Sequence, residues 1–358
     1  MQLSLYDFGL KKELKNQVLD IISIADEILL DAICKSIKEF QLLPKNQEYV
    51  LGFSGGKDSH VLLGIYILYL KLGNPPLDLI VKFADTKLEH ESLCKTISLS
   101  KKHCEYCKIP FAIVQSKNSY WWMQFALGYP VPNHRNRWCT GKLKIQPMQL
   151  SKKIKSITGR HLGESRSRDQ KLAKTSCGSD SCGSDLIKDK YDPLMHWRNC
   201  QIWDALFVFD SMLLYDNCFN LLQAQYEQAE DIKTGSLRMG CFMCPVISVK
   251  TIEQNYNSRL IDQKGVNIRY LLEELRLEPR INSAKTKNKG AIFIGSRRKY
   301  WKLLDKNYLL ENKWIAQEDI DEIDNAIKSN YSYPPTYKKD WIDKQHEILT
   351  WRSAIANI

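Results

Sequence analysis

Leu51-Gly-Phe-Ser54-Gly55-Gly56-Lys57-Asp58-Ser59 is the stretch that decides the fold of this 358-residue chain. The apolar run Tyr49-Val50-Leu51 leads into it, and apolar residues at helical spacing follow it. A strand, a glycine turn and a helix start aim backbone N–H groups and the positive helix end at one point. The sequence therefore predicts an anion-binding turn, to which Lys57 adds a positive charge and the two serines add hydroxyl donors.

This turn differs from the commonest nucleotide-binding loop. A Walker A loop would have glycine in place of Leu51 and Ser or Thr in place of Asp58. A carboxylate beside phosphates is explained if it holds Mg²⁺. The residues Ser54-Gly55-Gly56-Lys57-Asp58-Ser59 resemble the PP-loop of enzymes that cleave ATP between the α- and β-phosphates. An ordinary glycine-rich turn between a strand and a helix is the structural alternative.

Length, charge and cysteine content limit the class of protein. The chain is long enough for one large or two smaller domains. Its N-terminal region has no signal pattern and no apolar run reaches spanning length, so we expect a cytoplasmic location. In that compartment 11 cysteines favour metal or redox chemistry over disulfides. A nucleic-acid partner would explain the net charge of +11, although a basic surface without a ligand would explain it too.

Strands and helices alternate after the turn. Residues 77–86 form a predicted buried strand, residues 88–104 a helix, and residues 111–115 the next strand. This alternation predicts an α/β fold with a doubly wound parallel sheet. Residues 8–40 carry apolar positions at helical spacing, which predicts one or two helices packed on the core, with a dimerisation helix as the alternative.

Polar residues follow two predicted strands at their carboxyl ends, where open α/β sheets bind ligands. Asp85 and Thr86 end one strand and are expected to face a nucleotide, with a helix cap as the alternative. Residues 157–163 form another predicted strand, and arginines beside its end suit bidentate phosphate binding. A solvated basic loop is the alternative here. The candidate residues of this segment are Arg160, Gly163, Glu164, Ser165 and Arg168.

Several cysteines could supply metal ligands. Cys241 and Cys244 form a Cys-x-x-Cys turn between Gly and Pro, which suits two thiolates on one ion. Cys139 opens a basic helix, and Cys177 and Cys182 lie in a Gly- and Ser-rich loop. Four thiolates drawn from residues 139, 241, 244 and one of the loop pair could hold one inorganic centre, with structural Zn²⁺ as a competing metal.

Two further patterns have structural alternatives. Cys104 and Cys107 fall where a helix ends, and we interpret them as structural or surface thiols rather than a metal or redox pair. Residues 297–302 interleave basic and aromatic side chains, which suits a nucleic-acid backbone and its bases. A solvated helix face with core aromatics would give the same pattern.

The order of these motifs resembles the phosphoadenosine-phosphosulfate-reductase-like branch of the PP-loop superfamily. Within it the chain is most similar to the DndC and SspD proteins of DNA phosphorothioation, over about residues 48–250. The resemblance implies an adenine nucleotide α-hydrolase-like sheet with added N-terminal helices. The predicted regions are N-terminal helices over 1–45, an ATP-binding domain with an iron–sulfur site over 46–250, and a basic, mainly helical region over 251–358. The motifs are Ser54–Ser59, Phe83–Thr86, Trp138–Pro147, Gly163–Arg168 and Gly240–Cys244.

The resemblance also implies a [4Fe–4S] cluster on Cys139, Cys241 and Cys244. The Cys-Gly context assigns the fourth ligand to Cys182, with Cys177 as the alternative. Iron–sulfur reductases of this branch carry a Cys-Cys pair where Trp138 and Cys139 stand, and sulfonucleotide reductases use a C-terminal cysteine that is not found here. Both departures count against sulfate reduction.

We therefore expect an ATP-dependent sulfurtransferase that activates a DNA backbone phosphate and releases AMP and pyrophosphate. ATP, Mg²⁺ and the cluster are the expected cofactors, and DNA, a cysteine desulfurase and other phosphorothioation proteins are the expected partners. The alternatives are a tRNA thiolation enzyme, a sulfonucleotide-reductase-like enzyme, and a non-enzymatic iron–sulfur subunit that binds nucleic acid. The expected catalytic residues are Lys57, Asp58, Arg160 and Arg168, and the nucleotide site adds Ser54, Gly55, Gly56, Ser59, Asp85, Thr86, Gly163, Glu164 and Ser165.

Overall fold

The chain forms two compact units, each with its own hydrophobic core. Unit 1 comprises Met1–Ala84, His90–Val114 and Met148–Met239, and unit 2 comprises Asp85–Glu89, Gln115–Pro147 and Gly240–Ile358. A computed structural model describes residues 5–24, 26–133, 136–148, 154–161, 190–211, 218–227, 241, 244, 262–278, 280–282 and 289–329.

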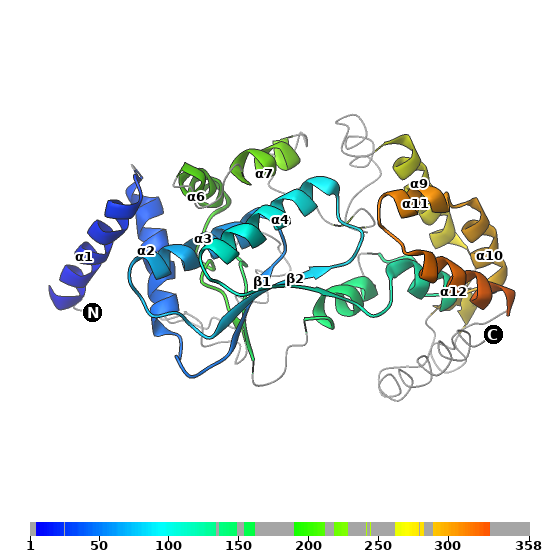
Figure 1. Cartoon of the computed structure of the whole chain (residues 1–358), viewed down its shortest axis with the longest axis horizontal. Coiled ribbons are helices and arrows are strands. Elements are labelled where there is room, and N and C mark those ends of the chain that lie inside the picture. The colour runs from blue at the N-terminus through cyan, green and yellow to red at the C-terminus, as the bar shows by residue number, and fades with distance from the viewer. Residues whose placement is uncertain are drawn as a thin grey trace. The chain divides into compact units, whose positions relative to one another are not determined.

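Unit 1 is built on a five-stranded sheet in the order β3-β2-β1-β4-β5, of which Figure 1 labels β1 and β2. The neighbours β2 and β1, β1 and β4, and β4 and β5 run parallel, and Leu51 of the central strand lies opposite Val81 and Ile157. The predicted α/β fold with a parallel sheet is confirmed. The strands are β1 (Tyr49–Phe53), β2 (Leu79–Asp85), β3 (Phe111–Gln115), β4 (Lys155–Ile157) and β5 (Lys190–Tyr191).

The helix that follows the glycine turn, α3 (Lys57–Lys71), is the core helix of unit 1. Its residues 61–69 are all buried, as in a helix that is covered on every side. It packs against β1, α2 and α6, and Gly64 lets the Phe209 ring approach so closely that a Cβ would lie 2.5 Å from it. The other helices of this unit are α1 (Leu5–Ile21), α2 (Glu27–Leu42), α4 (Glu91–Tyr106), α6 (Asn199–Ser211) and α7 (Cys218–Glu227).

The predicted N-terminal helices and the first cysteine pair both belong to this core. Leu29, Ile33 and Ile37 of α2 are buried in it, so the prediction of helices packed on the core is confirmed. Cys104 is fully buried and Cys107 packs against the same cluster. Burial raises the pKa of Cys104 to about 12, which keeps its thiol neutral and agrees with a structural role.

Unit 2 is mainly helical, as expected of the C-terminal region, and is packed around aromatic side chains. Tyr300 and Trp301 are buried in that core, so these aromatics are core residues, and Arg297 is buried as well and donates to the Phe125 and Ala126 carbonyls. No helix in the described ranges is long and apolar enough to cross a membrane. The elements are η1 (Trp122–Ala126) and η2 (Thr140–Ile145), both π-helical, α9 (Gln263–Leu277), the antiparallel pair β6 (Arg280–Asn282) and β7 (Lys289–Ile292), α10 (Ile294–Leu303), α11 (Lys306–Glu311) and α12 (Gln317–Lys328).

Candidate functional site

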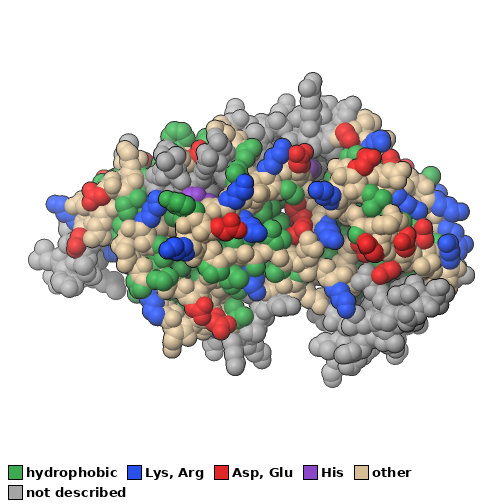
Figure 2. All heavy atoms as spheres, viewed as in Figure 1, with side chains coloured by type: hydrophobic (Ala, Val, Ile, Leu, Met, Phe, Trp, Pro, Cys, Tyr) green, Lys and Arg blue, Asp and Glu red, His purple; other side chains and the backbone are tan. Residues whose placement is uncertain are grey.

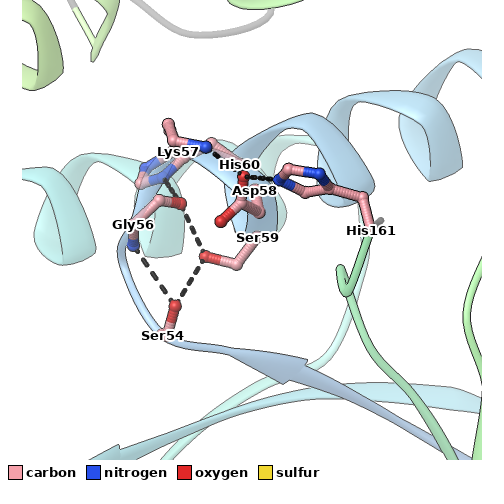
Figure 3. A network of polar contacts seen from close by, with 7 residues as sticks. All are labelled: Ser54, Gly56, Lys57, Asp58, Ser59, His60 and His161. Atoms are coloured by element: carbon pink, nitrogen blue, oxygen red, sulfur yellow. Dashed lines mark hydrogen bonds and ion pairs between the residues drawn. The ribbon is translucent and has the colours of Figure 1, made fainter. Parts of the chain in front are cut away.

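The loop between β1 and α3 has the geometry that the glycine motif predicts (Figure 3). Gly55 has φ +74°, and a Cβ there would lie 2.7 Å from Leu93 Cδ1, so both its backbone conformation and its surroundings require glycine. Gly56 is the N-cap of α3, and no side chain in the described part of the chain caps the first turn. The first backbone N–H groups of α3 are therefore without a side-chain acceptor, which is how helix N-termini bind anions.

The two serines of the motif close this loop. The Ser54 hydroxyl donates to Ser59 Oγ at 3.2 Å, and the Ser59 hydroxyl donates to the Gly56 carbonyl at 2.8 Å. The Gly56 N–H in turn approaches Ser54 Oγ at 3.4 Å. These contacts hold the loop in one shape before any ligand arrives, which lowers the entropy cost of binding one.

Asp58 lies between two nitrogen donors. Lys57 Nζ lies 2.6 Å from Asp58 Oδ1, and His161 Nε2 donates to the same oxygen at 3.2 Å. Burial raises the pKa of Asp58, but the His161 hydrogen bond and the Lys57 charge outweigh it, so the net pKa is lowered and the carboxylate is charged at neutral pH. Both described contacts use Oδ1, which leaves Oδ2 available as a ligand for Mg²⁺. Sequence reasoning missed His161, which comes from the segment after β4.

His60 supports the loop from beneath and was also missed. Its Nδ1–H donates to the Gly56 carbonyl at 3.0 Å, and its Nε2 accepts from the Ser100 hydroxyl at 3.1 Å. Burial lowers the pKa of His60 to about 4, so the ring is neutral at pH 7 and this tautomer is the one that satisfies both contacts. The signal in the sequence was a polar residue four positions after Gly56 within an otherwise apolar helix.

Arg160 lies just past β4, but its guanidinium already has a carboxylate partner. Its Nε donates to Asp192 Oδ1 at 3.0 Å and its Nη2 pairs with Oδ2, a bidentate arrangement. A phosphate would compete with Asp192 for this fork. The other predicted residues of this segment, Gly163, Glu164, Ser165 and Arg168, lie outside the described residues.

The predicted strand of this segment is present as β4 (Lys155–Ile157), but its bounds were wrong, because it ends at Ile157 and residues 158–161 lie outside it. Gly159 explains why the chain leaves the sheet there: a Cβ on it would lie 2.7 Å from the Asp58 carbonyl oxygen. The segment thus turns to pack on the start of α3 instead of continuing along the sheet. Because of this close approach, His161 lies within hydrogen-bonding distance of Asp58.

Asp85 and Thr86 belong to unit 2, where a buried carboxylate organises the loop 85–89. The Thr86 backbone N–H and hydroxyl donate to Glu89 Oε2 and Oε1, at 3.1 and 2.7 Å. Asp85 accepts from the Lys87 backbone N–H at 2.7 Å and from Gln115 Nε2 at 2.6 Å. The helix-cap alternative was wrong, because the N-cap of α4 is His90. Glu89 carried no signal in the sequence.

The loop 85–89 contributes to a small polar pocket of unit 2. Asp85 and Thr86 line it together with residues 115–119, Leu143 and Asp319. The first two are the residues expected to face a nucleotide. Their assignment to an ATP site stays a prediction.

The three cysteines assigned by resemblance come together in unit 2. The Cys241 and Cys244 thiols are hydrogen-bonded to each other, and the Cys244 backbone N–H donates to the Cys241 carbonyl at 2.9 Å. Burial and the proximity of Cys244 raise the pKa of Cys139, and the Cys244 hydrogen bond and burial raise that of Cys241. Cys177 and Cys182 lie outside the described residues.

Two cationic side chains, Lys144 and Arg269, lie near these cysteines. Burial lowers the pKa of Lys144, but the neighbouring Cys241, Glu89, Cys244 and Cys139 outweigh it and raise the pKa, so this ammonium is held charged. Arg269 donates to the Cys244 carbonyl at 3.1 Å and pairs with Glu273 at 3.2 Å. Buried positive charge of this kind offsets the negative charge that thiolates acquire when they bind metal.

The all-thiol donor set suits an iron–sulfur cluster, and the choice between a cluster and a single ion stays a prediction. Among the described residues, no three His, Cys, Asp or Glu side chains converge on one metal ion. The thiolates of a [4Fe–4S] cluster bind separate irons, so they need not converge as the ligands of one zinc ion do. All-thiol donors with cations beside them match a cluster of net negative charge.

Comparison with known proteins identifies the family to which the chain belongs. A parallel α/β sheet whose first strand leads through a glycine loop into a buried helix defines a broad class of α/β proteins. The model of the phosphoadenosine phosphosulfate reductase domain matches residues 48–247, more than half of the chain, and the protein belongs to that family. No curated protein matches the chain.

Two solved structures are similar at low identity. One is Candida glabrata FMN adenylyltransferase in complex with FMN and the ATP analog AMPCPP, with 18% identity, a TM-score of 0.32, and coverage of 55% of this chain and 65% of that chain. The other is the U34-tRNA thiolase NcsA from Methanococcus maripaludis with its [4Fe-4S] cluster, with 16% identity, a TM-score of 0.32, and coverage of 79% and 86%. At these TM-scores neither likeness carries an argument about activity.

Proposed function

We propose that the protein is an ATP pyrophosphatase and sulfurtransferase that activates a DNA backbone phosphate for phosphorothioate modification. The observation that carries this proposal is the closed glycine loop at the uncapped start of α3, with the ionised Asp58 beside it. Membership in the reductase-domain family supports ATP-type chemistry at this loop. The closer resemblance to DndC and SspD directs the proposal to DNA.

The loop residues have separate tasks toward ATP. The N–H groups of the first turn of α3, together with Lys57 and the Ser54 and Ser59 hydroxyls, bind the β- and γ-phosphates. Asp58 holds Mg²⁺ through its available carboxylate oxygen, while His161 and Lys57 keep that carboxylate ionised. Charge neutralisation and positioning of this kind are the main contributions a protein makes to such a reaction.

The proposed reaction consists of two displacements, adenylylation of the DNA phosphate and then replacement of the adenylyl group by sulfur. A non-bridging oxygen of the DNA phosphate attacks the α-phosphorus of ATP, the bond to the β-phosphate oxygen breaks, and pyrophosphate leaves. A sulfur nucleophile at the oxidation state of sulfide then attacks the DNA phosphorus. The bond from this phosphorus to the oxygen that carries the adenylyl group breaks, and AMP leaves. One oxygen is replaced by one sulfur. If the donor is a desulfurase-bound persulfide, a second thiol supplies two electrons and ends in a disulfide with the donor cysteine.

The cysteine site would hold a cluster on Cys139, Cys241 and Cys244, with Cys182 as the proposed fourth ligand. When bound, the cluster supplies a place to hold or relay sulfur. Around it, Lys144 supplies positive charge and Arg269 fixes the Cys244 carbonyl.

The charge of the chain supports a polyanionic partner without locating it. The net charge is +11, and on the face drawn in Figure 2 the Lys and Arg side chains stand among Asp and Glu side chains instead of forming one continuous patch. Lys and Arg side chains that are spread over a surface bind backbone phosphates with an affinity that depends on salt and not on the base sequence.

Mass spectrometry of digested nucleic acid tests the proposal. A deletion strain is complemented with the wild-type gene or with a Lys57→Ala, Asp58→Ala double variant. We expect phosphorothioate dinucleotides in DNA only with the wild type. Loss of a thiolated nucleoside from tRNA, with DNA unchanged, would assign the protein to RNA instead. Full restoration by the double variant would show that the loop is not used and that the protein is a non-enzymatic subunit.

A further inference from the structure

A buried carboxylate, Asp192, ties the segment that follows β4 to the segment that follows β5. Its side chain is only 5% exposed. Its Oδ1 accepts from the Thr158 hydroxyl and from Arg160 Nε, and its Oδ2 pairs with Arg160 Nη2. The Thr158 backbone N–H also donates to the Tyr191 carbonyl at 2.9 Å, one residue beyond the paired part of β4. These contacts fix residues 158 and 160 relative to β5.

The turn that carries Asp192 is itself anchored to α2. The Pro193 carbonyl accepts from the Ser36 hydroxyl at 2.8 Å, and the Trp197 indole N–H donates to Ser36 Oγ at 2.9 Å. Ser36 is fully buried and Trp197 nearly so. Because a satisfied, buried polar network is rigid, Asp192 has little freedom to move away from its partners.

The segment that Asp192 holds leads directly to the loop site. Gly159 lies between the two residues that Asp192 binds, and it packs against the Asp58 backbone at the start of α3. His161 follows Arg160 and donates to Asp58 Oδ1 at 3.2 Å (Figure 3). A shift of this segment would therefore move His161 relative to the Asp58 carboxylate.

The contacts of Arg160 favour a role in this anchor over phosphate binding. To bind a phosphate through the same fork, its guanidinium would have to leave Asp192. The Asp192 carboxylate would then be buried without its cationic partner, which is strongly destabilising.

We propose that Asp192 is a positioning residue for Asp58, the carboxylate that holds Mg²⁺ in the proposed function, on which this inference rests. Asp192 fixes the segment 158–160, and His161 at the end of that segment orients the Asp58 carboxylate. Hydrogen-bond partners that orient a metal ligand in this way typically change metal affinity by about 10–100-fold when they are lost.

The test is the affinity of full-length protein for Mn²⁺, a paramagnetic substitute for Mg²⁺, in the presence of AMPCPP, whose α–β bridge is not cleaved. Free Mn²⁺ is measured by electron paramagnetic resonance. The variants are Asp192→Asn, Arg160→Lys, which keeps the charge but loses the fork, and His161→Phe. The first two are also combined with His161→Phe. Asp31→Asn is the control, because it breaks an ion pair with Lys15 elsewhere in unit 1.

We expect His161→Phe to weaken Mn²⁺ binding by about 10–100-fold, and Asp192→Asn and Arg160→Lys by about tenfold. Each double variant should bind Mn²⁺ as His161→Phe alone does, because both changes remove the same orientation of Asp58. Asp31→Asn should keep the wild-type affinity.

Wild-type Mn²⁺ affinity in folded Asp192→Asn overturns the inference, and so do additive losses in its double variant or an equal loss in the Asp31→Asn control. Tighter AMPCPP binding in Asp192→Asn, with weaker binding in Arg160→Lys, also overturns it, since Arg160 would then be a phosphate ligand. If circular dichroism shows that Asp192→Asn does not fold, Arg160→Lys and its double variant decide by the same criteria.

The result separates this inference from the proposed function. Wild-type protein that binds no Mn²⁺ with AMPCPP overturns the role of Asp58 along with this inference. The measurement uses neither DNA nor cleavage of the nucleotide, so a failure of the DNA chemistry alone leaves the result standing.

Discussion

The loop site of unit 1 and the cysteine site of unit 2 are built in opposite ways. The loop site comes almost whole from one contiguous stretch, Ser54–Ser59, and its side chains contact one another while the first N–H groups of α3 stay open to a ligand. The cysteine site gathers residues 139, 144, 241, 244 and 269 from distant parts of the sequence, and the pKa values of Lys144 and Cys241 are raised there. A preformed loop suits a ligand that comes and goes, whereas thiols gathered from distant segments suit a resident centre.

The largest expected effect separates the two sites by activity. Asp58→Asn removes the charge proposed to hold Mg²⁺ but keeps the shape of the side chain. We expect AMP formation to fall by about 10²–10³-fold, the scale of losing one charge-stabilising group. Iron content is the control and is expected to stay at the wild-type level. Wild-type rates of AMP release in this variant would remove Asp58 from the mechanism.

The reciprocal change addresses the cysteine site. Cys139→Ser is expected to lower the iron bound per chain by roughly tenfold or more, since even changes beside a metal ligand cost 10–100-fold in affinity. Cys104→Ser is the matched control, because that thiol is fully buried in the core of unit 1. Equal iron in the two variants, measured after anaerobic purification, would show that Cys139 is not a ligand.

A pH dependence is expected from the support beneath the loop. The pKa of His60 is about 4 in the folded protein, whereas an unperturbed histidine has a pKa of 6.5. The unfolded chain therefore binds more protons than the folded protein between pH 4 and pH 6.5. The stability from keeping His60 neutral is present above pH 6.5 and is lost as pH falls toward 4, by up to about 3 kcal/mol. In urea titrations, the free energy of unfolding of His60→Gln should fall less steeply than that of the wild type as the pH is lowered from 6.5 to 4. An identical slope would mean that another group titrates there.

The smallest effect compares two glycines with the same backbone conformation. Gly55 and Gly73 have φ +74° and +77°, but only Gly55 has atoms close to where a Cβ would stand. Alanine at either position adds left-handed strain of about 1–2 kcal/mol. At Gly55 the overlap with Leu93 should add roughly 1–3 kcal/mol to the loss of unfolding free energy. Equal losses in urea titrations would indicate that Leu93 moves aside freely.

The same contrast explains what the sequence could predict. The loop and the parallel sheet were predictable because their signals are local: contiguous glycines, a lysine and a carboxylate, and alternating apolar strands and helices. The Cys241–Cys244 pair was visible for the same reason. Its association with Cys139 came from resemblance, because more than 100 residues separate them.

The residues that were missed depend on contacts made only in the folded chain. His161 reaches Asp58 because Gly159 packs on the start of α3, and no spacing rule encodes that approach. Arg160 is an obvious phosphate ligand in the sequence, but Asp192 meets it across the β4–β5 connection.

The fate of ATP at the loop tests the proposed function most directly. Purified full-length protein is incubated with MgATP, DNA and a sulfide source, and the nucleotide products are separated and counted. We expect AMP and pyrophosphate in equal amounts, with both lost in Asp58→Asn. Release of ADP and inorganic phosphate by the wild type would contradict cleavage between the α- and β-phosphates and with it the proposed activation of DNA.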